Sequence, residues 1–170
     1  MGVLYDYFRA PDQKTALMLL DVGDGVPAGP TTVHADMDAL DAKGIDPYVV
    51  LGQLIAFLLD VPWSVDLIDT VSVWPPEETK PASTEDFERL PADSPWHTGP
   101  WLEEFSDRIR DALADADDGA LPSIAERWAR IEEFGGHMDA AGARDVIDGF
   151  VALARRARRA SDRLYCWCCL

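Results

Sequence analysis

The chain has few of the cations that bind polyanions. It contains 15 Lys and Arg against 31 Asp and Glu, which gives a formal net charge of −16. Proteins bind nucleic acids largely through Lys and Arg that neutralise phosphates, and a charge of this size repels them. A nucleic-acid ligand is therefore not expected, and a basic protein is the partner that the charge favours.

The chain also has no long hydrophobic run and no recognisable targeting signal. Its longest apolar stretch, residues 48–59, is too short to span a bilayer and contains Gln53. The first residues lack the basic and apolar regions of a signal peptide, and Asp6 stands where the myristoylation pattern needs Ser or Thr. The three cysteines lie within the last five residues, unlike the disulfide framework of a secreted protein. We expect a cytoplasmic protein that does not associate with membranes.

Sequence motifs for catalysis are missing as well. The chain contains no G-x-S-x-G, no phosphate-binding G-x-x-x-x-G-K-[ST] and no G-x-G-x-x-G. No Ser or Cys follows a recognised nucleophile pattern with a His. The sequence therefore favours a non-enzymatic protein without a cofactor.

The segments that are present predict one domain over residues 1–170. An apolar content of 48% is sufficient for a core at this length. Composition and periodicity predict strands at 3–8, 65–74 and 164–170, and helices at 13–20, 46–59, 101–116, 121–134 and 139–164. The segment 13–20 could equally be a buried strand, because periodicity cannot distinguish the two at this length. The predicted fold class is α+β, mostly helical, with a small sheet that includes the N- and C-terminal strands.

The negative charge is concentrated in the middle of the sequence. Residues 61–120 hold 15 Asp and Glu against 4 Lys and Arg, a balance of −11. Within this region, residues 75–100 are rich in Pro and acids, which predicts an exposed loop with one short helical turn at 84–90. The skew indicates either an acidic interaction face or two parts of one fold that neutralise each other.

Two tryptophans flank a histidine at the end of this loop. Trp96, His97 and Trp101 could form a binding lip, with Glu103 and Glu104 beside them. The alternative, which we favour, is that the Trp rings pin a long loop onto the helices. Adjacent glutamates could act as an acid and a base, but such pairs are more often simply solvated.

The basic residues form one late cluster, from Arg155 to Arg163. Arg155, Arg158 and Arg159 could contact an anion or a partner, because guanidinium groups suit carboxylates and phosphates. The favoured alternative is that they neutralise the acids of the domain itself and the negative end of their helix.

Two groups of residues could hold a metal, and neither is predicted to do so. Cys166, Cys168 and Cys169 lack the Cys-x-x-Cys turn of zinc sites. On a strand, Cys166 and Cys168 would share one face and Cys169 would occupy the other, which favours buried thiols. The alternating His and Asp residues from His34 to Asp38 are more simply a solvated acidic segment. The terminal strand could also pair with a second copy, which would give a homodimer.

Three segments resemble the DUF1877 family of small bacterial proteins of unknown function. They are the opening Met1-Gly2 with the strand that carries Tyr5 and Tyr7, the apolar helix that ends in Phe57-Leu58-Leu59, and the late Ala- and Arg-rich helix that leads into Leu164-Tyr165-Cys166-Trp167. The resemblance implies an α+β architecture and supplies no catalytic residues.

The sequence therefore predicts an acidic cytosolic binding protein, of an immunity or inhibitor type, that engages a basic partner. The alternative is a small-molecule or metal-dependent enzyme with a site near Trp96, His97 and Trp101.

Overall fold

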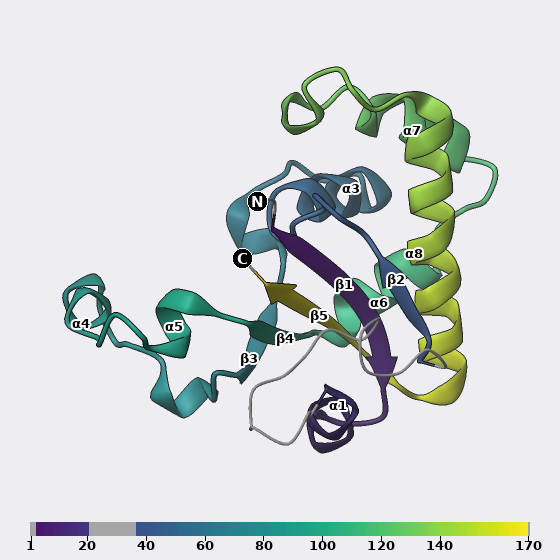
Figure 1. The fold of residues 1–170 in the computed structure, drawn as a ribbon. Coiled ribbons are helices and arrows are strands. Elements are labelled where there is room, and N and C mark those ends of the chain that lie inside the picture. The colour runs from purple at the N-terminus through teal and green to yellow at the C-terminus, as the bar shows by residue number, and fades with distance from the viewer. Residues whose placement is uncertain (1–2, 21–36, 170) are drawn as a thin grey trace.

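The computed structural model describes residues 3–20 and 37–169, which form an α+β domain around one antiparallel sheet (Figure 1). The sheet has five strands in the order β2-β1-β5-β4-β3. They are β1 (Leu4–Ala10), β2 (Ala39–Asp41), β3 (Thr70–Trp74), β4 (Trp101–Phe105) and β5 (Arg163–Cys169). The predicted fold class is confirmed, including the sheet that contains both terminal strands.

The C-terminal strand β5 lies in the centre of the sheet. It pairs with β1 along its whole length, from Leu4 opposite Cys169 to Ala10 opposite Arg163, and with β4 on its other side. Both edges of β5 are thus hydrogen-bonded within the domain. It offers no free edge to a second copy, so the pairing through this strand that the sequence suggested is wrong.

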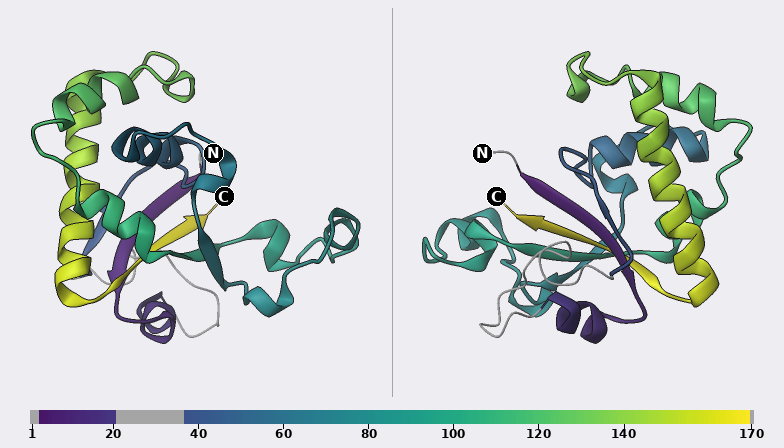
Figure 2. Two further views of the ribbon diagram at one scale, coloured as in Figure 1. Left: turned by 180° about the vertical axis from the view of Figure 1, so that it is seen from behind. Right: turned by 45° about the vertical axis from the view of Figure 1, so that its right-hand side comes forward.

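One face of the sheet is covered by four helices, which enclose the main core (Figures 1 and 2). They are α3 (Val50–Leu59), α6 (Asp107–Ala114), α7 (Leu121–Trp128) and α8 (Ala140–Ala160). The predicted central helix is α3, whose Leu54 and Ile55 are fully buried. Its start is fixed by Asp46, whose carboxylate accepts hydrogen bonds from the backbone N–H groups of residues 48–50.

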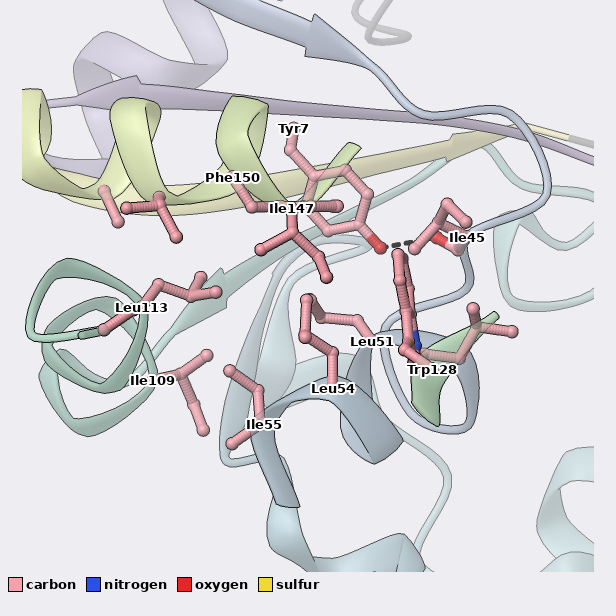
Figure 3. Packing of buried hydrophobic residues seen from close by; sticks show 14 of the residues in the cluster. Tyr7, Ile45, Leu51, Leu54, Ile55, Ile109, Leu113, Trp128, Ile147 and Phe150 are labelled. Carbon is pink, nitrogen blue, oxygen red and sulfur yellow. Dashed lines mark hydrogen bonds between the residues drawn. The ribbon is translucent and has the colours of Figure 1, made fainter. Parts of the chain in front are cut away.

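Two polar side chains inside this core are hydrogen-bonded to backbone carbonyl groups. The Tyr7 hydroxyl donates to the carbonyl oxygen of Ile45 at 2.6 Å (Figure 3). The Trp128 indole donates to the carbonyl oxygen of Val50 at 2.9 Å. Tyr7 also contacts the edge of the Phe150 ring, with 4.8 Å between centroids. These two hydrogen bonds attach β1 and α7 to the segment around α3. They therefore help to fix the positions of these elements, in addition to the apolar packing.

The opposite face of the sheet packs against α1 (Gln13–Leu20). Ala16 and Leu20 of this helix are fully buried in a second cluster with Phe8 and Tyr165. The segment is therefore a helix and not the strand that its apolar run also allowed. Residues 23–30, whose Gly and Pro content predicts a loop, lie outside the described residues.

The largest error of the sequence prediction is the helix expected at 101–116. Its first part is β4, and the helix α6 begins only at Asp107. Trp101, Phe105, Ile109 and Leu113 follow one another at steps of four, which is typical of a helix, but β5 and β3 pair with the first two through backbone hydrogen bonds. Tertiary pairing thus overrides the local pattern.

Other boundaries differ by less. The strand expected at 65–74 is a 3-10 turn at Val65–Leu67 followed by β3, and the helix expected at 121–134 ends at Trp128. The last helix is confirmed as α8: Asp139 caps its start by accepting from the Gly142 N–H, and the chain leaves it at Ser161 with φ 60°. None of the helices in residues 3–20 and 37–169 is long and apolar enough to cross a membrane.

Candidate interaction surface

Residues 75–100, here called the arm, connect β3 to β4 and project away from the sheet and its helices (Figures 1 and 2). The arm contains a 3-10 turn at Glu77–Thr79, α4 (Thr84–Glu88) and α5 (Pro95–Thr98). It begins and ends at a cis peptide bond, Trp74–Pro75 and Gly99–Pro100. The exposed loop and its short turn at 84–90 were predicted, whereas α5 was not.

Side-chain caps and one indole hold the arm in shape. The Ser83 hydroxyl accepts from the Asp86 N–H at 3.1 Å, and the Ser94 hydroxyl accepts from the Trp96 N–H at 3.3 Å. The Trp96 indole donates to the Thr79 hydroxyl at 3.1 Å and so joins the two ends of the arm. Trp96 therefore links two parts of the arm rather than pinning the arm onto the helices, as the sequence had favoured. The arm keeps its shape with Pro75 and Ser94 as its only buried residues.

The acids of the arm are all exposed, and half of them have no cation beside them. They are Glu77, Glu78, Glu85, Asp86, Glu88 and Asp93. Lys80 pairs with Glu77 at 3.3 Å, and Arg89 pairs with Glu85 and Asp86. Among the described residues, Glu78, Glu88 and Asp93 form no ion pair.

An aromatic pair lies among these carboxylates. The ring of His97 meets the ring of Phe87 edge to face, with 4.5 Å between centroids. Phe87 is nevertheless 38% exposed. Phe87 was not among the predicted site residues, although a phenylalanine between two acids in a Pro-rich loop is an unusual signal.

Five of the seven acids at residues 101–120 form ion pairs inside the domain, and Glu103 and Asp117 form none with a described residue. Arg155 of α8 pairs with Asp118 at 2.9 Å and donates to the carbonyl oxygens of Ala114 and Ala116, at the C-terminal end of α6. Arg158 pairs with Asp115. Arg159 is exposed and forms no ion pair with a described residue. Two of the three arginines predicted to contact an anion thus contact the protein's own acids.

The glutamates of β4 point to opposite faces of the sheet. Glu103 accepts a hydrogen bond from the Tyr48 hydroxyl at 2.6 Å, and burial raises the pKa of Glu103. Glu104 accepts from the Tyr165 hydroxyl at 2.9 Å on the other face. Neighbouring residues of a strand diverge in this way, so the two carboxylates do not form an acid and base pair.

The predicted binding residues His97 and Trp101 lie apart from each other. Trp101 is on β4 opposite Cys168, while His97 contacts Phe87 edge to face within the arm. No described contact brings His97 to Trp101 or Glu103. A binding lip made of all five predicted residues is therefore not assembled.

The cysteines follow the predicted alternation. Cys166 lies opposite Tyr7 and Cys168 opposite Tyr5, on the face that the four helices cover, whereas Cys169 packs in the second cluster. In the described part of the chain, no group of three or more His, Cys, Asp or Glu could hold a metal ion. His34 lies outside that part.

Sequence reasoning also missed a cleft at the start of β1. It has a volume of about 710 Å³ and is open to solvent, with Tyr5, Lys43, Asp46 and Glu133 among its lining residues. Asp46 is occupied as the cap of α3, and Glu133 accepts a hydrogen bond from Gln53. Two of the polar side chains that line this cleft are thus already hydrogen-bonded within the domain.

Comparison with known proteins gives no further indication: no protein-family model matches the chain, and neither does a curated protein sequence or a solved structure. The resemblance to DUF1877 remains an expectation.

Proposed function

We propose that this protein is a non-enzymatic cytosolic binding protein that engages a basic protein partner through the acidic arm. The observation that carries the proposal is the contrast between the two acidic parts of the chain. Asp115 and Asp118 are paired with arginines of α8, whereas Glu78, Glu88 and Asp93 are left without a cation on an element that projects from the domain.

A projecting group of unpaired carboxylates suits recognition of a positive surface. Complementary charge raises the rate of encounter and disfavours acidic competitors. The capped turns and the bond between Trp96 and Thr79 hold the backbone that carries these carboxylates in one shape, which lowers the entropy lost on binding. An inhibitor or immunity protein would work in this way, by covering the basic surface of its target.

The alternative enzyme receives less support. It would need His97, Trp101 and the glutamates of β4 to converge, and the contacts of Glu103 and Glu104 separate them.

The test compares two variants of equal charge. The first removes three arm carboxylates (Glu78→Gln, Glu88→Gln, Asp93→Asn), and the second removes three exposed carboxylates elsewhere (Glu126→Gln, Glu132→Gln, Asp145→Asn). Binding to immobilised cytochrome c and lysozyme, two basic proteins, is measured between 50 and 300 mM salt, which are roughly the limits within which screening changes strongly. We expect the arm variant to bind at least about fivefold more weakly than the control variant. Equal binding by the two variants would assign the attraction to bulk charge and refute the proposal.

A further inference from the structure

Phe87 adds an exposed apolar side chain to the acidic arm. This side chain limits the kind of partner surface that the arm can bind. The residue belongs to α4, the part of the arm that extends farthest from the sheet in all three views (Figures 1 and 2). Of its large apolar neighbours in the chain, Leu90 is half-buried and Trp96 is bonded to Thr79, so Phe87 alone remains as an exposed aromatic ring of the arm.

The position of the ring is fixed before any partner binds. Ser83 caps the start of α4, and the Ser83 hydroxyl also donates to the Asp86 carboxylate at 2.7 Å. His97, from α5, supports one edge of the Phe87 ring. An exposed aromatic side chain that is held in this way presents apolar area at a small entropic cost.

Carboxylates adjoin the ring in the sequence of α4. Arg89 neutralises Glu85 and Asp86, while Glu88, directly after Phe87, has no cation among the described residues. An apolar centre with a charged surround is the usual anatomy of an interface, in which a few aromatic residues supply most of the binding energy and the rim excludes water.

We infer that Phe87 is the anchor of the interface and that the partner is a folded protein with an apolar depression surrounded by Lys or Arg. This inference rests on the proposed function, because Phe87 belongs to the same arm as the unpaired carboxylates. A basic partner surface without an apolar centre would leave Phe87 exposed to water or would bury it against polar groups. Such a surface would gain less free energy from contact with Phe87.

The test uses a displayed library of a small folded scaffold that is randomised on one face. Binders are selected on the whole protein and counter-selected on the arm variant Glu78→Gln, Glu88→Gln, Asp93→Asn. The dissociation constants of the best binders are then measured for the unchanged protein and for Phe87→Ala, Phe87→Leu and Met18→Ala. Met18 is the matched control, because it is 65% exposed on α1, which covers the face of the sheet opposite to the four helices.

We expect binders that combine basic and apolar residues, about tenfold weaker binding by Phe87→Ala, a smaller loss for Phe87→Leu and no change for Met18→Ala. Binders that are basic only, with Phe87→Ala unchanged, would overturn the anchor and leave the proposed function intact. If every binder recovered before the counter-selection also binds the arm variant with full affinity, so that the counter-selection leaves none, the proposed function itself is refuted. Far-UV circular dichroism of each variant shows whether it is folded.

Discussion

The carboxylate of Glu77 accepts a hydrogen bond from the backbone N–H of Ser72, with 3.0 Å between the two atoms. Ser72 belongs to β3, the strand at one edge of the sheet. Free N–H groups on an edge strand are sites where a strand of another molecule can pair. The first turn of the arm therefore protects the edge of the sheet from which the arm departs.

Glu77→Ala should expose this edge and promote self-association. We expect the variant to sediment as larger species at high protein concentration and to lose about 1 kcal/mol of unfolding free energy with the hydrogen bond. Glu78→Ala is the control, because Glu78 is also exposed and the substitution removes the same charge. Similar sedimentation of the two variants would show that Glu77 has no protective role.

Asp38 connects the ends of three elements through two arginines. Its carboxylate pairs with Arg9 of β1 at 2.6 Å and with Arg156 of α8 at 2.6 Å. These guanidinium groups, Arg156 first, lower the pKa of Asp38 to about 2, while partial burial opposes them. Asp38→Asn should therefore destabilise the fold by about 1–2 kcal/mol at neutral pH, less than a fully buried pair because the groups are partly solvated.

The effect of Asp38→Asn on the free energy of unfolding should depend on pH. A carboxyl whose pKa is lower in the folded state stabilises the fold above its unfolded pKa, which is 3.8, and loses that contribution as the pH falls towards about 2. Urea unfolding of the two proteins should thus differ most above pH 4 and converge near pH 2. A constant difference across this range would show that the ion pairs are not its source.

Sequence patterns were sufficient where one local signal determines the element. The terminal strands were visible from their β-branched and aromatic residues, and α8 from its amphipathic period and the Asp139 cap. The alternation of Cys166, Cys168 and Cys169 followed once the last segment was read as a strand. In each case the local preference and the tertiary environment agree.

Sequence patterns failed where pairing partners decide the structure. The segment from Trp101 to Phe105 fits a helical period and a strand equally well, and only the free edges of β5 and β3 select the strand. That error also hid the separation of Glu103 from Glu104. The acidity of the arm could be predicted from the sequence. Its projection from the domain and the exposure of Phe87 could not, because they depend on how the whole chain packs.

The thiols on β5 should react slowly in the folded protein. Burial, before the nearby Glu103 charge, raises the pKa of Cys166 well above its usual value, and burial raises that of Cys168 to about 11. Because the thiolate is the reactive form, alkylation of both at pH 7.5 should be far slower than that of a free cysteine. Iodoacetamide labelling followed by peptide mass spectrometry, with and without urea, measures each site. Rapid labelling of Cys166 without urea would show that this strand opens in the native state.

Asp6 should make the protein more stable at mildly acidic pH. Its side chain lies in β1 opposite Asp41 of β2, and burial, followed by the charge of Asp41, raises the pKa of Asp6 to about 6. The Lys43 charge only partly compensates. A carboxyl whose pKa is higher in the folded state destabilises the fold once it ionises, so its contribution to unfolding free energy falls as the pH rises from 3.8 to about 6.

Asp6→Asn removes that ionisation and should raise the free energy of unfolding at pH 7 by about 1–2 kcal/mol, with little effect at pH 4. Asp41→Asn is the companion variant: it keeps Asp6 and should lower its pKa, which NMR titration of the Asp6 carboxyl carbon measures directly. If Asp6→Asn shifts stability equally at pH 4 and pH 7, the cause is packing and not charge. The opposed carboxylates would then be a tolerated feature of the β1–β2 pair, since solvent at the sheet edge would already screen their repulsion.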